Sequence, residues 1–215
     1  MKKIILLPLF LLSAIIVFAS GGGKKECPPE GKANPKKGKN AVLKPREKNL
    51  NIHKNRETAP QPSDFDKTVT IQRMYDSKDD SIFDADKGAV IEGYVLKASD
   101  NGMESCNCFT EDKTQYSTNL YISPTPITKQ TRSADCIVVV ITPYSRTLHS
   151  EWNADLFNYK MIGKKVRVSG WLLYDYSKSS LSIETNSNGA QPERRTIWGI
   201  CPMTELKSLE PGDKN

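Results

Sequence analysis

The chain has 215 residues, with 31 Lys or Arg against 25 Asp or Glu, a formal net charge of +6. This length can hold one or two domains. The basic character is uneven, because residues 24–60 carry a net charge of +7 and residues 61–215 a net charge of −3. The composition therefore excludes a folded domain that is basic over its whole surface, as a general nucleic-acid grip would need.

The first residues read as a targeting segment. Met1-Lys2-Lys3 is a positively charged start, residues 4–18 are almost wholly apolar, and Val17-Phe18-Ala19 suits cleavage after Ala19. This is the pattern of a secretory signal over residues 1–19, so we expect export to the periplasm or the outside. The alternative is a membrane anchor over residues 4–19, although that run is shorter than the ~20 residues of a spanning helix. Lipid modification of Cys27 is a third interpretation, which the charged Lys25 and Glu26 disfavour.

Residues 20–65 are rich in Lys, Pro, Gly and Asn, with almost no apolar residue before Ala41. Such a segment buries too little surface to offset its chain entropy, so it is expected to be a disordered basic linker. It serves either as a spacer or as an electrostatic arm for an anionic membrane, an envelope polymer or nucleic acid. Residues 66–87 form a lead-in of ambiguous pattern.

Alternating or β-branched runs then predict strands, bounded by Gly and Pro. Gly93, inside the first, marks an expected bend or bulge, and Pro202 is expected to interrupt the last. A helix is expected from Ser150, as N-cap, to Lys160, ended by Gly163. The expected strands are residues 88–98, 117–123, 135–143, 164–176 and 196–210.

The second half of the expected domain runs in the order strand, helix, a strand that begins after a Gly, and a final strand. A small OB-type barrel ends with the same order of elements. We therefore expect an all-β fold with one short helix, which lies between strands 3 and 4 of a five-stranded OB-type Greek-key barrel. The domain should cover residues 88–209, followed by a disordered end over 210–215. Trp152, Trp171 and Trp198 are expected in its core.

Five segments carry a resemblance. Together they resemble an OB-fold domain of small exported bacterial proteins. The segments are EGYVLKASDNGMESCNC, VVVITPYSR, a Trp followed by the helix, IGKKVRVSGWLLYD and TIWGICPMTEL. Those proteins are described as OB-fold, nucleic-acid-binding-like or uncharacterised. The resemblance covers roughly residues 88–207 and implies a barrel with a binding face.

The chain departs from that family at its histidines. The family's final strand ends in Glu-Ile-His-Pro, where this chain has Gly199-Ile200-Cys201-Pro202, and a His follows the paired cysteines or lies in the second strand. Here the stretches read Cys106-Asn107-Cys108-Phe109 and Asn119-Leu120-Tyr121. A metal or acid–base role that depends on those histidines does not carry over.

The cysteines are the next candidates. An exported protein can form disulfides, and five cysteines leave at least one unpaired within the chain. Disulfides, buried thiols and a thiolate metal site all remain open, although one C-x-C is not the usual pair of zinc knuckles. The candidates for a disulfide or a free thiol are Cys106, Cys108, Cys136 and Cys201.

No catalytic constellation is evident. His53 lies in the basic segment and His149 precedes the expected helix, without a nucleophile elbow nearby. The acids of residues 76–86 precede the first barrel strand, and the carboxylate motif of thermonuclease-type barrels is absent. We expect no enzyme activity, no cofactor and no metal site.

Binding is the remaining function. OB barrels present strands 2 and 3, with the loops between strands 1 and 2 and strands 4 and 5, to oligonucleotides or oligosaccharides. Aromatic platforms and cations on those elements are the candidate ligand contacts. They are Tyr116, Tyr121, Tyr144, Arg146, Tyr174, Tyr176, Arg194 and Arg195.

The sequence thus favours an exported binding module for single-stranded nucleic acid, an anionic glycan, another oligomeric ligand or a protein partner. The alternatives are a metal-dependent nuclease or hydrolase relative, and a thiol- or metal-handling envelope protein that uses Cys106 and Cys108.

Overall fold

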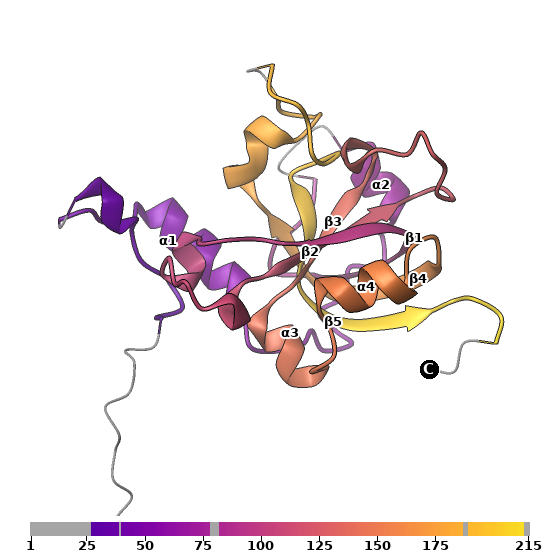
Figure 1. Ribbon diagram of the computed structural model, residues 1–215, viewed down its shortest axis with the longest axis horizontal. Coiled ribbons are helices and arrows are strands. Elements are labelled where there is room, and N and C mark those ends of the chain that lie inside the picture. Colours follow the sequence, from indigo (N-terminus) through magenta and orange to yellow (C-terminus); the bar gives the residue numbers. More distant parts are fainter. Residues whose placement is uncertain (1–26, 39, 78–81, 187–188, 213–215) are drawn as a thin grey trace, which may run out of the picture.

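The computed structural model describes residues 27–38, 40–77, 82–186 and 189–212. Five strands form a closed barrel in the order β1-β2-β3-β5-β4 (Figure 1). The predicted five-stranded OB-type barrel is confirmed. The strands are β1 (Gly88–Asp100), β2 (Thr118–Ser123), β3 (Ile137–Ile141), β4 (Lys165–Tyr174) and β5 (Trp198–Ser208).

All neighbouring strands pair antiparallel except β3 and β5, which pair in parallel through Val138↔Gly199 and Val139↔Ile200. Alternate side chains of each strand point into the barrel because successive side chains leave opposite faces. The interior is aliphatic and fully buried, with Val139 and Ile200 at its centre and Trp198 at one end.

Two local expectations about the strands need correction. The register shift of β1 falls between Val95 and Lys97, not at Gly93. Gly93 is required for another reason, since a Cβ there would lie 2.5 Å from the carbonyl oxygen of Ser123 on β2. Pro202 does not interrupt β5, which runs through a cis Cys201–Pro202 peptide bond.

The chain between β3 and β4 forms two short helices instead of one. The first, α3 (Pro143–Leu148), is capped by Thr142, whose side chain accepts from the backbone N–H of Ser145. The second, α4 (Ala154–Lys160), starts later than predicted because Asn153, not Ser150, is its N-cap. Trp152 lies buried between them and stacks on His149 at 4.0 Å, which fixes the bend.

The segment before the barrel is where the structure differs most from expectation. Residues 20–65 were expected to be a disordered linker, but the described part of them is folded and includes α1 (Pro45–Lys54). A further helix, α2 (Ile71–Tyr75), lies in the lead-in and buries Met74 in the core. The expected targeting segment and the last three residues lie outside the described residues.

Trp171, which was expected in the core, instead contacts the segment before the barrel from the outer face of β4. Its indole N–H donates to the carbonyl oxygen of Thr58 at 2.6 Å, and the guanidinium of Arg56 lies over its ring at 4.8 Å. The side chain is half-buried. The segment before the barrel therefore contacts the outside of β4 as well as the loops.

Candidate functional site

Helix α1 lies against the outside of the barrel over β4 and β5. Its sequence is mostly polar, and Leu50 is its one buried apolar side chain. Leu50 packs with Leu173 of β4 and Cys201 of β5, next to Val140 of β3. Part of the surface that an OB barrel offers to a ligand is therefore covered by the chain itself.

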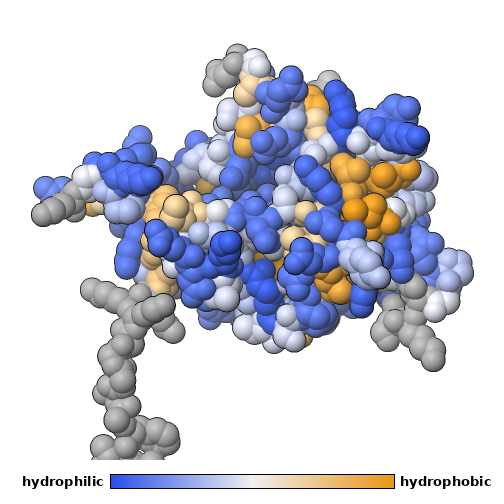
Figure 2. Space-filling view, in the orientation of Figure 1, coloured by the Kyte–Doolittle hydropathy of each residue, from blue (hydrophilic) through white to orange (hydrophobic). Residues whose placement is uncertain are grey.

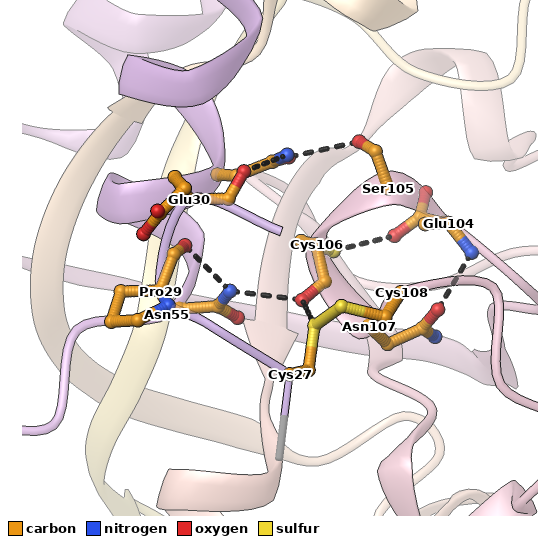
Figure 3. The surroundings of a disulfide bond; sticks show 10 residues. Cys27, Pro29, Glu30, Asn55, Glu104, Ser105, Cys106, Asn107 and Cys108 are labelled. Carbon is orange, nitrogen blue, oxygen red and sulfur yellow. Dashed lines mark hydrogen bonds between the residues drawn. A yellow bond between two sulfur atoms is a disulfide. The ribbon is translucent and has the colours of Figure 1, made fainter. Parts of the chain in front are cut away.

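A disulfide fastens the start of this segment to the β1–β2 connection. Cys27 is bonded to Cys108, 81 residues later in the chain, and the sulfur of Cys27 lies 3.3 Å from the carbonyl oxygen of Cys106 (Figure 3). Asn55, just after α1, donates to the carbonyl oxygens of both Pro29 and Cys106 at 2.9 Å. Three separate segments are thus joined at one place.

Gly31 allows the closest approach at this junction. Its φ is +70°, in the left-handed region, and an added Cβ would lie 2.1 Å from the carbonyl oxygen of Ser105. The backbone N–H of Lys32 donates to the same carbonyl oxygen at 3.0 Å. Only glycine combines this φ with this contact.

A buried network of charges lies beneath α1. The ammonium of Lys54, the last residue of the helix, is 3.0 Å from the carboxylate of Asp175, which follows β4. A second pair joins Lys178 to Glu104 at 3.0 Å. Arg194 is only 6% exposed, and its Nε has no hydrogen-bond partner among the described residues.

The pKa values follow from this network. Burial would raise the pKa of Asp175, but Lys54 and Arg194 outweigh it and hold the value at about 2. Burial would likewise lower the pKa of Lys54, but the carboxylates of Asp175 and Glu104 raise it above its ordinary value. Both groups therefore stay charged through the neutral range, and Lys54 is not a proton donor or acceptor there.

The other three cysteines are buried thiols. Burial raises the pKa of Cys106 and of Cys136 to about 12, and raises that of Cys201 as well. A thiol with such a pKa holds almost no thiolate at neutral pH, so these residues are poor nucleophiles. Cys106 and Cys108 are not bonded to one another, and the described residues contain no group of His, Cys, Asp and Glu that could hold a metal ion.

A groove opens beside the disulfide. It measures about 380 Å³ and lies between residues 27–57, the β1–β2 connection and the start of α3. Its charged lining residues are Lys54, Glu57 and Asp112. Since Lys54 is paired with Asp175, the described residues of the wall include no unpaired cation for an anionic ligand. The rest of the wall consists of Asn, Gln, Thr, Ser, Pro and Tyr residues, the free Cys106 and the disulfide itself.

Two side chains in this wall are suited to a ligand. Tyr144 is half-buried at the start of α3, and Gln115 is exposed in the β1–β2 connection. Neither the phenol of Tyr144 nor the amide of Gln115 forms a hydrogen bond to another described residue. They therefore offer an aromatic face and a free amide to the same groove.

Arg146 fixes these two residues relative to each other. It lies two residues after Tyr144, and its guanidinium donates to the carbonyl oxygens of Thr114, at 3.2 Å, and of Tyr116. These carbonyls flank Gln115. Arg146 is therefore a positioning residue for the groove and does not itself line it.

Three other predicted tyrosines are engaged within the fold, whereas Tyr116 is half-buried and contributes its backbone carbonyl oxygen to Arg146. Tyr121 is 5% exposed and packs with Cys136 and Val138 outside the barrel. Tyr174 packs on Trp198 with ring centroids 5.0 Å apart, and the ring of Tyr176 lies 3.9 Å from the guanidinium of Arg46.

Two predicted arginines are likewise engaged within the fold and are not available to a ligand. The guanidinium of Arg195 donates to the carbonyl oxygen of Tyr75 at 2.9 Å, and Arg194 belongs to the buried charges. Of the predicted ligand contacts, the structure thus places Tyr144 in the groove, with Arg146 behind it.

Sequence reasoning missed Lys54, Gln115 and the role of Cys27. The net charge of the basic segment predicts exposed lysines, but one of them, Lys54, is buried against Asp175. Gln115 stands in a polar run, EDKTQ, that carries no periodic signal. An available signal was the odd cysteine, Cys27, which lies outside the expected barrel but had Cys108 as a possible partner.

Comparison with models of protein families and with curated proteins gave no match for this chain. No helix within the described ranges has the length and apolar character needed to cross a membrane.

Proposed function

We propose that this protein is an exported, non-enzymatic binding module whose groove takes an uncharged oligosaccharide. Export is supported by the signal-like residues 1–19 together with the Cys27–Cys108 disulfide, because disulfides persist in oxidising compartments. The observation that carries the ligand class is the described wall of the groove, which joins a free aromatic ring and a free amide and has no unpaired cation among its residues.

Sugar recognition suits these groups. The C–H face of a pyranose ring carries slight positive charge and packs on the negative face of an aromatic ring such as Tyr144. A planar amide such as that of Gln115 can donate to one hydroxyl and accept from another. Oligosaccharides are among the ligands that OB barrels bind through the loop between strands 1 and 2.

Nucleic acid fits the groove less well. Binding to a phosphate backbone requires several free Lys or Arg side chains, because affinity follows the number of phosphates neutralised. The charged residues of this groove's described wall are Glu57, Asp112 and a lysine, Lys54, that is already paired. The aromatic Tyr121 on β2, which could stack a base, is buried. Anionic glycans meet the same electrostatic obstacle.

The test is a binding assay by calorimetry with four probes: a chito-oligosaccharide, a cello-oligosaccharide, a heparin fragment and a single-stranded oligothymidylate. We expect a neutral glycan to bind and to change the NMR signals of Tyr144 and Gln115. Tyr144→Ala should weaken binding about tenfold, the equivalent of about 1.4 kcal/mol. The matched control is Tyr159→Ala, since Tyr159 is 87% exposed on α4 and does not line the groove.

The proposal fails if no neutral glycan binds, or if the two tyrosine variants lose affinity equally. Salt-sensitive binding of the oligothymidylate alone would instead favour the nucleic-acid interpretation.

A further inference from the structure

Residues 32–38 and 40–48, which follow the disulfide and reach into the start of α1, form an arm that stands away from the barrel. Figure 1 shows the short 3-10 helix Pro35–Lys37 at the far left, beyond α1. That helix buries none of its residues. Both roots of the arm are fixed: Cys27 is bonded to Cys108, and the side chain of Asn51 in α1 donates to the carbonyl oxygen of Glu30 at 2.9 Å. The arm therefore has a set position on the barrel.

The arm carries a dense positive charge. Its described lysines are all exposed, and none forms an ion pair with another described residue. Figure 2 shows the projecting end covered by hydrophilic residues. The two acids, Glu30 and Glu47, are fewer than the cations, and the carboxylate of Glu47 accepts from the backbone N–H of Lys44 at the start of α1. The exposed lysines are Lys32, Lys36, Lys37, Lys44 and Lys48.

One apolar side chain stands among these lysines. Val42 is 83% exposed, and it lies between Lys37 and Lys44 in the sequence. An exposed aliphatic residue flanked by lysines matches the interfacial pattern in which cations meet headgroups and an apolar residue enters the acyl boundary. Nucleic acid would gain nothing from Val42, because stacking on bases needs a flat ring or a guanidinium.

We propose that this arm, residues 32–38 and 40–48, binds an anionic lipid surface, with the described lysines on the headgroups and Val42 inserted between them. The interaction is independent of the groove and holds whatever ligand the groove binds. It would keep the barrel beside a membrane at an orientation set by the disulfide and by α1.

The test is co-sedimentation of the chain from Ser20 onward, which keeps every described residue, with vesicles of phosphatidylcholine or of phosphatidylcholine containing phosphatidylglycerol. We expect sedimentation with the anionic vesicles only, lost at high salt. The double variant Lys36→Glu, Lys37→Glu should weaken binding by tenfold or more, since each lysine near an anionic surface is worth about fivefold in affinity. Val42→Asp should also weaken it severalfold.

Two matched controls separate the arm from general charge and from general hydrophobicity. Lys129→Glu with Lys160→Glu makes the same change of charge at exposed sites outside the arm, and Val90→Asp replaces an exposed valine of β1. Both should bind like the parent chain, and all variants should keep its melting temperature because no buried side chain is touched.

Equal loss in the control variants would overturn the proposal, as would sedimentation with neither vesicle. A third result would also overturn it: the lysine variant loses affinity for single-stranded DNA, while no variant changes sedimentation with vesicles. That result would assign the arm to nucleic acid.

Discussion

Lys54 is the residue through which the segment before the barrel reaches the buried charges. Its ammonium meets Asp175 where little water can reach either group. Removing one partner of a buried pair is costly, because the charge left behind stays out of water without compensation. The two ends of this pair are not equivalent: Asp175 also interacts with Arg194, whereas the second carboxylate near Lys54, that of Glu104, is already paired with Lys178.

We therefore predict that Asp175→Asn lowers the free energy of unfolding by about 3–5 kcal/mol, because it leaves Lys54 and Arg194 buried together. Lys54→Met should cost less, since Arg194 still offsets Asp175. Urea unfolding of both variants measures the difference. Equal costs, or a larger cost for Lys54→Met, would show that Arg194 does not compensate.

The pH dependence of the same experiment has a definite sign. Asp175 has a folded pKa of about 2, below its ordinary value of 3.8, so its contribution is complete above about pH 4 and is lost as pH falls toward 2. The stability gap between the parent chain and Asp175→Asn should therefore shrink over that range and stay constant between pH 5 and 8.

At the scale of elements, α1 depends on its attachments more than on its own sequence. The helix is short and polar, and helices of this length are marginal in isolation. Leu50, Lys54 and Asn55 hold one end to the barrel, and the Cys27–Cys108 bond holds the chain that leads into it. The bond closes a loop of about 80 residues, for which a typical disulfide contribution is 2–4 kcal/mol.

Replacing Cys27 and Cys108 by Ser should accordingly lower the free energy of unfolding by about 2–4 kcal/mol and expose residues 27–57 to protease before the barrel is cut. Urea unfolding and limited proteolysis with mass spectrometry are the measurements. Cys136→Ala removes a buried thiol elsewhere and should leave residues 27–57 within the protease-resistant core. Identical cleavage of the two variants would contradict a specific role for the bond.

The elements also show what a sequence can disclose. All five strands were predicted within about two residues of their observed ends, because apolar alternation and flanking Gly or Pro are local signals. The docking of α1 could not be predicted, since Leu50 is its single buried apolar residue and its partners lie more than a hundred residues later. The groove could not be predicted for a similar reason, because its wall combines three segments that meet only in the folded chain.

Considered as a whole molecule, the folded unit includes the described residues from Cys27 onward and does not begin at Gly88. The barrel strands alone leave Leu173 and Cys201 uncovered and Asp175 without its main partner. A chain that starts at Gln61 would lose the disulfide, α1 and the ion pair together. Their combined loss is comparable with the whole stability of a typical domain, about 5–15 kcal/mol.

We predict that the chain from Gln61 onward lacks a cooperative unfolding transition near that of the chain from Ser20 onward. Near-ultraviolet circular dichroism and urea unfolding would show this, and removal of residues 211–215 at the other end, which keeps the hydrogen bonds of Leu209 and Glu210 to Lys165, is the control. A transition at an unchanged midpoint would mean that the barrel is autonomous and the preceding segment an accessory.

The C-x-C of the β1–β2 connection poses a problem of selection. Cys106 and Cys108 are two residues apart, so closing a loop from Cys27 costs nearly the same chain entropy for either. The backbone separates them, since Cys106 is buried in the 3-10 helix Ser105–Asn107, whereas Cys108 has a φ of 56° and is partly exposed. The folded barrel therefore favours the Cys27–Cys108 pairing over Cys27–Cys106, whether the bond forms directly or by thiol–disulfide exchange, because the competing thiol is hidden once the β1–β2 connection has folded.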